Sequence, residues 1–337
     1  MIWLLFPFAL IYALITTIRN ELFDLKVWKS RRYSKPTIGV GNLSMGGTGK
    51  SVVIDYLIDL LKKEHALAVL SRGYNRKTKG FLLADKDATA KTIGDEPFQF
   101  YIKNPEIKVA VAEKRSLGMQ HLLKLNPSPE VFLWDDVFQH RHVSPKLMIL
   151  TTTFYKPYFE DYVIPLGTLR ERRKGVKRAD IVLVTKCPEK LSLDQAAQIR
   201  TKLKLDAFQY LFFTKIQYDP ELICKSGKLS LKTFGKEKFF LVCGIANPDP
   251  IIAYLKEQGY QFESLLFPDH FNFNRKAVLQ IQSKAKNKKL LTTEKDFGRL
   301  APLLNNLELY YLPIRMGFVF EKDQKTFNTL IKGSITN

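Results

Sequence analysis

The residues of this chain whose types and spacing are most typical of chemistry are Gly-Gly-Thr-Gly-Lys-Ser at 46–51. An apolar run, Thr37–Val40, precedes them, and apolar residues at helical spacing follow them. A glycine-rich loop that ends in Lys-Ser between a strand and a helix is the arrangement of a P-loop, which binds phosphate groups through backbone N–H groups and the helix N-terminus. Lys50 then contacts the β- and γ-phosphates, and Ser51 contacts Mg²⁺. The residues expected to bind the nucleotide are Met45, Gly46, Gly47, Thr48, Gly49, Lys50 and Ser51.

One position departs from the full P-loop pattern. The pattern has glycine five residues before Gly49, where this chain has Ser44. The alternative is a glycine-rich turn that binds nothing. The strand-to-helix context and the Gly-Lys-Ser ending favour phosphate binding.

A second acidic signal follows the apolar run Val131–Trp134, which predicts a buried strand that ends at Asp135 and Asp136. A carboxylate at such a strand end lies beside a P-loop and binds Mg²⁺ directly or through water. A solvated strand end is the alternative. Gln139 and His140 follow closely, in a loop suited to phosphate recognition; metal ligation by His140 and His142 is a further alternative.

Gly94-Asp95-Glu96-Pro97 opens a predicted helix, and Asp95 has two interpretations. Aspartate is a common N-cap residue, and proline is favoured in the first turn of a helix. The functional alternative is a general base that takes the proton from a hydroxyl nucleophile.

Basic residues dominate two further loops, 71–80 and 169–174. The whole chain has 53 Lys and Arg against 33 Asp and Glu, a formal charge of +20. Such an excess suggests an anionic partner: nucleic acid, anionic lipid or a phosphorylated substrate. No nucleic-acid-binding motif accompanies it. The three cysteines have no zinc spacing and form no even set for disulfides, so a reducing compartment is expected.

The first residues, Met1–Ile18, are almost wholly apolar, and a basic flank follows them from Arg19 to Arg32. A spanning helix needs about 20 apolar residues and at the least about 17, so this segment is borderline. It is expected either to span once, with the basic flank in the cytoplasm, or to lie in the membrane interface. A buried core helix is the third alternative.

Apolar strands alternate with helical patterns along most of the chain, which predicts a parallel sheet covered by helices. We expect an α/β fold: an N-terminal membrane-associated helix (1–22), a P-loop NTPase-like domain (23–207), a two-stranded linker (208–235) and a smaller α/β domain (236–332). The linker is expected to pair Phe208–Tyr218 with Lys228–Thr233.

A membrane-anchored GTPase or metallochaperone-type switch is a possible alternative for such a chain. Thr185-Lys186-Cys187-Pro188 follows a strand as a base-recognition motif would, but it lacks the aspartate that reads guanine. The absence of a cysteine metal motif also disfavours this class.

Nine motifs follow one another along the chain: 41–51, 71–74, 94–97, 135–141, 165–171, 178–180, 185–188, 268–270 and 292–296. Taken together they resemble the tetraacyldisaccharide 4'-kinase family of lipid A biosynthesis. The resemblance implies ATP- and Mg²⁺-dependent phosphorylation of the 4'-hydroxyl of a tetraacyldisaccharide 1-phosphate, giving lipid IVA. It also implies two α/β domains joined by a two-stranded linker. The resemblance further implies that the enzyme acts at the cytoplasmic face of the bacterial inner membrane.

The resemblance further implies roles for individual residues. Asp95 matches the catalytic base and His270 its orienting partner, with Lys50 on the phosphates and Ser51, Asp135 and Asp136 at the metal. A wider site is implied for Tyr74, Lys77, Arg115, Gln139, His140, Arg170 and Glu171. The departures are Ser51 for the more usual Thr, Val52 and Arg172 where Pro is common, and Val137 where a small residue is usual.

Overall fold

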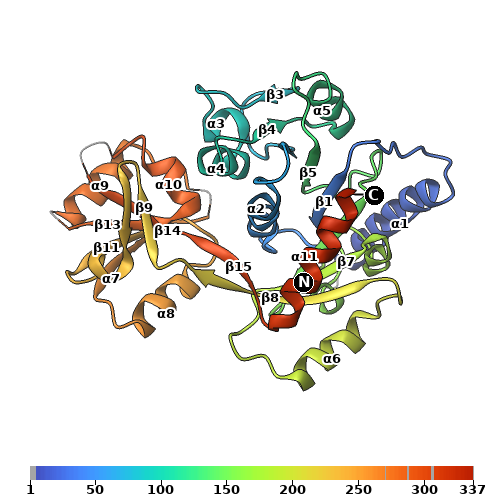
Figure 1. The fold of residues 1–337 in the computed structure, drawn as a ribbon. Coiled ribbons are helices and arrows are strands. Elements are labelled where there is room, and N and C mark those ends of the chain that lie inside the picture. The colour runs from blue at the N-terminus through green and yellow to red at the C-terminus, as the bar shows by residue number, and fades with distance from the viewer. Residues whose placement is uncertain (1–4, 270, 287, 305–306, 337) are drawn as a thin grey trace.

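The computed structural model describes residues 5–269, 271–286, 288–304 and 307–336. Two sheets organise the chain (Figure 1). We call the nine-stranded sheet with its helices the large lobe, and the six-stranded sheet with its helices the small lobe. The expected α/β fold with parallel sheets is confirmed. The expected site residue His270 lies outside the described residues.

In the large sheet, β1 (Thr37–Asn42) lies between β5 (Val131–Asp135) and β6 (Leu147–Thr153), and both pairings are parallel. The full order is β15-β8-β7-β6-β1-β5-β2-β4-β3. The remaining strands are β2 (Leu67–Ser71), β3 (Leu82–Leu83), β4 (Lys108–Val111), β7 (Ile181–Thr185), β8 (Tyr210–Tyr218) and β15 (Ile314–Phe318). Because β1, β2 and β5 are parallel, the loops that follow them meet at one edge of the sheet.

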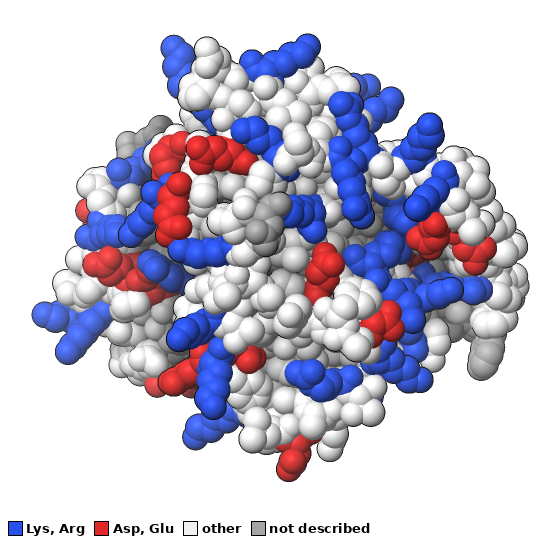
Figure 2. All heavy atoms as spheres, turned by 45° about the vertical axis from the view of Figure 1, so that its right-hand side comes forward, with Lys and Arg blue, Asp and Glu red and all other residues white. Residues whose placement is uncertain are grey.

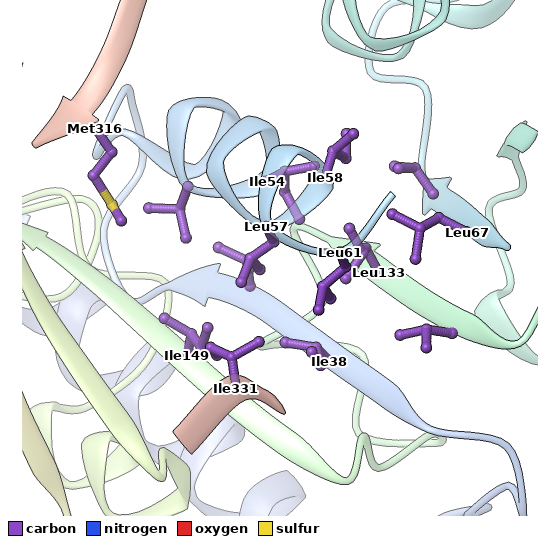
Figure 3. Close-up of a cluster of buried hydrophobic side chains, with 14 of the residues drawn as sticks. Ile38, Ile54, Leu57, Ile58, Leu61, Leu67, Leu133, Ile149, Met316 and Ile331 are labelled. Carbon is purple, nitrogen blue, oxygen red and sulfur yellow. The ribbon is translucent and has the colours of Figure 1, made fainter. Parts of the chain in front are cut away.

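The helix that follows the P-loop, α2 (Lys50–Leu61), packs on the sheet through one apolar face (Figure 3). Ile54, Leu57 and Leu61 are fully buried against strand residues such as Ile38 and Leu133. Burial of such a side chain contributes about 1.5–3 kcal/mol. Further helices of this lobe include α3 (Ala90–Ile93), α4 (Asp95–Lys103), α5 (Arg115–Leu122), α6 (Leu193–Leu203) and the 3-10 turns Tyr158–Glu160 and Arg173–Arg178. This packing fixes where α2 begins, and with it Lys50.

The small sheet has the order β10-β9-β14-β13-β11-β12. Its strands are β9 (Glu221–Cys224), β10 (Gly227–Ser230), β11 (Phe239–Cys243), β12 (Phe262–Leu266), β13 (Leu290–Thr293) and β14 (Leu309–Leu312). Its helices are α7 (Leu231–Phe234), α8 (Asp249–Glu257), α9 (Arg275–Ala285) and α10 (Glu294–Leu300). The four strands β11 to β14 pair in parallel, as the alternation of strands and helices predicts.

Two strands run between the lobes, but they are not the pair expected from the sequence. β8 pairs antiparallel with β15, and β8 also continues the large sheet beside β7. The segment Lys228–Thr233, expected to be its partner, instead contributes to the short hairpin of β9 with β10. The partner strand comes from far along the chain, where the local pattern of the sequence does not reveal it (Figure 1).

The end of the chain returns to the large lobe. Helix α11 (Glu321–Thr336) buries Phe327 and Ile331 in the same core as α2. The hydroxyl of Tyr56 on α2 donates a hydrogen bond of 2.8 Å to Oδ1 of Asn328. From the sequence we expect residues 236–332 to form one domain. In the structure, β15 and α11 from this range pack on the large sheet instead.

Helix α1 (Phe6–Asp24) lies on the large lobe, on the side away from the small lobe (Figure 1). It buries Ala9, Ala13, Thr16 and Phe23. Its opposite side leaves large apolar side chains exposed: Phe6, Phe8, Leu10, Ile11, Leu14, Ile15 and Ile18. The sequence left open whether this segment spans a membrane; within the described residues, no helix has the length and apolar character that a crossing requires.

Candidate active site

The P-loop lies between β1 and α2, and its backbone requires glycine at two positions. Gly46 and Gly49 have φ values of 98° and 87°, which residues with a side chain rarely adopt. The backbone N–H of Met45 donates 2.7 Å to the carbonyl of Thr168, and Ser44 forms a single antiparallel bridge with Leu169. Ser44 therefore occupies its non-glycine position without strain, and the segment before Arg170 runs beside the loop.

Buried hydroxyl and amide groups of the neighbouring strands form hydrogen bonds with the P-loop. Nδ2 of Asn42 donates to the carbonyl of Ser44 at 2.7 Å and to the hydroxyl of Thr48 at 2.9 Å. The hydroxyls of Thr48 and Thr151 are 2.7 Å apart, and Thr185 donates 2.8 Å to the carbonyl of Thr48. These contacts fix the loop through three neighbouring strands. The sequence analysis did not single out Asn42, Thr151 or the Thr185 hydroxyl.

Lys50 and Arg170 converge on Asp136. Nζ of Lys50 lies 3.4 Å from Oδ1 of Asp136, and Nη1 of Arg170 lies 3.0 Å from Oδ2. Burial alone raises the pKa of Asp136, but the charges of Lys50 and Arg170 outweigh it and hold the pKa below its ordinary value. Asp136 is thus an anion that contacts two cations at the P-loop.

Asp135, at the end of β5, is buried and carries an oxygen without a partner. The hydroxyl of Ser71 donates 2.9 Å to its Oδ2, while its Oδ1 is buried without a hydrogen bond among the described residues. Burial, with the neighbouring charge of Asp136, raises the pKa of Asp135 to about 6. A hard cation such as Mg²⁺ takes carboxylate oxygens, so this unpartnered oxygen fits such an ion. In the described part of the chain, His, Cys, Asp and Glu form no group of three or more that could hold a metal by themselves.

Arg115 is buried behind the two aspartates. Its guanidinium donates a hydrogen bond of 2.6 Å to the carbonyl of Asp135 and one of 2.8 Å to the carbonyl of Ala112. Burial lowers its pKa to about 10, against the opposite effect of the two aspartate charges. Arg115 therefore holds the turn after β5 instead of pointing into solvent.

Gln139 and Glu171 connect this cluster to α1. The amide of Gln139 donates to the carbonyl of Asn42 at 2.9 Å and to Oε1 of Glu171 at 3.1 Å. Arg178, which the sequence analysis did not assign to the site, donates to both carboxylate oxygens of Glu171 at 2.9 Å. Asn20 of α1 donates 2.6 Å to Oε2 of the same carboxylate. Glu171 thus anchors α1 to the site.

His140 follows Gln139 in the same loop. Burial, together with the charge of Arg115, lowers the pKa of His140 to about 3, so its ring is neutral at physiological pH. His142 instead lies against Phe23 and Trp28 at ring-centroid distances of 5.0 and 6.4 Å. The alternative in which both histidines ligate one metal has no support in this geometry.

Asp95 is the first residue of α4, and Gly94 before it is the N-cap. The capping interpretation places Asp95 at the N-cap position, which Gly94 occupies instead. Glu96, which the sequence analysis left unassigned, is close enough to raise the pKa of Asp135 through its charge. The N-terminus of α4 therefore faces the Asp135 side of the site.

The remaining expected residues lie at the periphery. Tyr74 and Lys77 are exposed in the loop after β2. Lys186, another residue the sequence did not assign, donates 2.7 Å from its ammonium to the carbonyl of Gly47. The motif that was compared with a guanine-recognition sequence thus contacts the P-loop through its lysine.

Comparison with known proteins agrees with this geometry. A family model described as tetraacyldisaccharide-1-P 4'-kinase matches residues 1–336. The tetraacyldisaccharide 4'-kinase of Flavobacterium johnsoniae is 48% identical over 97% of this chain and 95% of that protein. That of Flavobacterium psychrophilum is 45% identical over 99% and 98%. A crystal structure of LpxK from Aquifex aeolicus in complex with ATP has a TM-score of 0.79 and 27% identity, and covers 98% of both chains. The family resemblance of the nine motifs is confirmed, and the chain belongs to the tetraacyldisaccharide-1-P 4'-kinase family.

Proposed function

We propose that this chain transfers the γ-phosphate of ATP to the 4'-hydroxyl of a tetraacyldisaccharide 1-phosphate, giving lipid IVA in lipid A biosynthesis. The observation that carries the proposal is the convergence of Lys50 and Arg170 on Asp136 at the P-loop, beside the unpartnered oxygen of Asp135. The identity of the acceptor is inferred from the family to which the chain belongs. The comparisons lend no support to the alternative of a GTPase or metallochaperone-type switch.

ATP is proposed to bind at residues 45–51, with Lys50 on the β- and γ-phosphates. Ser51 and Asp135 are the residues that would hold Mg²⁺, which would supply positive charge to neutralise the charge developing on the phosphates. Arg170 is placed to share the charge of the transferring phosphoryl group, since Asp136 holds its guanidinium beside Lys50. Positioning and electrostatic stabilisation account for most of the catalysis in such a reaction.

Asp95 is proposed as the general base that takes the proton of the 4'-hydroxyl. Support comes from its place at the start of α4 and from the proximity of Glu96 to Asp135. His270, implied as its orienting partner, belongs to this proposal through the motif resemblance alone. Tyr74 and Lys77, on the exposed loop after β2, are proposed to contact the acceptor.

The acceptor is proposed to reach the site from the membrane along α1, at the cytoplasmic face of the inner membrane. The exposed apolar face of α1 fits an interfacial helix. Its other face contacts the site, since Tyr12 donates 3.0 Å to the carbonyl of Arg170 and Arg19 donates 2.6 Å to that of Gln139. Lys and Arg side chains are widespread on the face of the molecule that Figure 2 shows, which suits anionic headgroups.

We also propose that the chain is organised as two domains. The large lobe combines residues 23–218 with β15 and α11, and the small lobe comprises the intervening sheet. The basis is the separate buried cores of the two sheets.

The direct test is transfer of labelled γ-phosphate to the tetraacyl disaccharide 1-phosphate by purified protein in detergent. We expect a lipid product that depends on ATP and Mg²⁺. Absence of transfer by a folded, ATP-binding protein would refute the proposal. Tight GTP binding with hydrolysis that needs no lipid acceptor would support the switch alternative instead.

A further inference from the structure

A buried ionic cluster joins the two lobes away from the phosphate site. The ammonium of Lys103 lies 2.9 Å from Oδ2 of Asp55 and 3.0 Å from Oε1 of Glu294. The side chains of Asp55 and Glu294 are only 7% and 6% exposed. A single cation therefore bridges two buried carboxylates.

The three residues belong to three elements that the proposed reaction needs. Asp55 is on α2, the helix that begins at Lys50, and Lys103 is the last residue of α4, which begins at Asp95. Glu294 is the first residue of α10 in the small lobe. The contact of Lys103 with Asp55 lies within the large lobe, and its contact with Glu294 crosses between the lobes.

One face of α4 carries both Asp95 and the bridging lysine. Asp95, Phe98, Gln99, Ile102 and Lys103 follow helical spacing, and all five line a crevice against α10. Gly298 on α10 allows close packing there, since a Cβ at this position would lie 3.3 Å from the ring of Phe98. The lobe contact is thus made by the same helical face that presents Asp95.

The contact between the lobes depends on the positive charge of Lys103, which lies between two buried carboxylates. Two carboxylates share one ammonium, and Oδ1 of Asp55 and Oε2 of Glu294 have no hydrogen bond among the described residues. Burial, against the opposing charge of Lys103, raises the pKa of Asp55 to about 7. Removing one partner from a buried charge cluster leaves uncompensated charge, which is strongly destabilising. Without Lys103, the two carboxylates would repel each other across the lobe boundary.

We propose that Lys103 is a positioning residue that fixes the small lobe against α4, and thereby fixes Asp95 relative to the P-loop during phosphoryl transfer. The inference rests on the proposed kinase function. Lys103 acts through α4, which joins it to Asp95. An error of about 1 Å in such positioning costs on the order of a hundredfold in rate.

The test compares Lys103→Met, Lys103→Arg, Glu294→Gln and Asp55→Asn in the full-length protein. The measurements are kcat, KM for ATP and amide hydrogen exchange in α10. Lys103→Met and Glu294→Gln are expected to lower kcat by about tenfold or more while KM for ATP changes less than about threefold. Both are expected to speed exchange in α10, and Lys103→Arg is expected to restore most of kcat.

Two variants serve as controls, Asp55→Asn from this set and Lys332→Met in addition. Asp55→Asn leaves the contact between the lobes in place, so it is expected to lower kcat less than Glu294→Gln and to leave exchange in α10 unchanged. Lys332→Met removes an exposed ion pair with Glu64 in the large lobe and is expected to behave as wild type. If Lys103→Met fails to fold, Glu294→Gln, which keeps the shape of the side chain, carries the test.

Wild-type kcat in a folded Glu294→Gln variant would overturn the inference. So would equal losses in kcat and in ATP binding for Lys103→Met, because that result indicates a general structural role. An Asp95→Asn variant separates this failure from failure of the proposed function. If Asp95→Asn loses activity while Glu294→Gln keeps it, the function stands and the positioning role of Lys103 is refuted; if wild-type protein transfers no phosphate, the function itself fails.

Discussion

Gly73 and Gly94 pack backbone against backbone. A Cβ at Gly94 would lie 3.1 Å from Cα of Gly73, and one at Gly73 would lie 2.7 Å from the carbonyl oxygen of Ile93. Both have positive φ values, 71° and 95°. The contact brings the loop that begins at Ser71, which binds Asp135, against the residue before Asp95. The proposed base and the proposed metal carboxylate are therefore linked through two glycines.

Gly94→Ala is expected to destabilise the protein and to reduce activity. Its φ of 95° is strained for alanine, which costs about 1–3 kcal/mol, and the new methyl group meets Gly73. Thermal unfolding should show a lower Tm, and a kinase assay should show a lower kcat. Gly333→Ala is the matched control, because Gly333 is in α11 with open space around it and should gain about 0.5–1 kcal/mol. Equal Tm values for wild type and Gly94→Ala would contradict the packing argument.

Asp95→Asn is expected to lower kcat by about 10²–10⁴-fold, the usual contribution of a general base, with little change in ATP affinity. The amide keeps the size of the side chain but does not accept the proton. Kinetics and ATP titration measure the two effects separately. Asp194→Asn, an exposed change in the first turn of α6, should keep the wild-type rate. Loss of ATP binding together with lower stability would instead favour a structural role at the helix start.

Asp135→Asn should change how the stability of the metal-free protein depends on pH. Because burial and Asp136 raise the folded-state pKa of Asp135 to about 6, its neutral form favours folding. The stabilising contribution is present at low pH and is lost as pH rises from about 4 through about 6, by up to about 3 kcal/mol. Urea unfolding at several pH values should therefore show Asp135→Asn gaining stability over wild type above about pH 6.

The same substitution should remove Mg²⁺-dependent activity, because the amide is a weaker cation ligand. The Mg²⁺ affinity of the wild-type protein is accordingly expected to rise with pH through about 6, as Asp135 of the metal-free protein ionises. Full activity of Asp135→Asn at ordinary Mg²⁺ concentrations would remove Asp135 from the metal site. The stability measurement without metal remains an independent check on its burial.

Replacement of Ile11, Leu14 and Ile15 by serine should weaken membrane binding by at least about tenfold. These side chains are 58%, 56% and 59% exposed, so their loss should cost little folding stability. Co-sedimentation with phosphatidylglycerol-containing vesicles measures the binding. Leu193→Ser, at an exposed apolar position on α6, is the control and should bind as wild type. Unchanged vesicle binding by the triple variant would refute the interfacial role of α1.

Much of the site followed from the sequence, because its groups occupy the ends of contiguous apolar strands. Thr37–Val40 and Val131–Trp134 predicted β1 and β5, and parallel pairing of these strands brings Lys50 and Asp136 together. The carboxyl ends of parallel strands lie at one edge of a sheet. The local apolar pattern and this rule were therefore sufficient to predict that Lys50 and Asp136 lie close together.

The tertiary structure alone decided the contacts between residues far apart in the chain. Pairing of β8 with β15, the contact of Asn20 with Glu171 and the link from Lys103 to Glu294 leave no periodic signal in the sequence. Each of these contacts depends on which apolar and charged surfaces are still exposed once the two sheets have formed. The sequence determined that the chain has a P-loop, and it predicted which residues bind phosphate there. Packing between distant elements decided how the two lobes are held against each other, because burial and charge pairing are properties of the assembled fold.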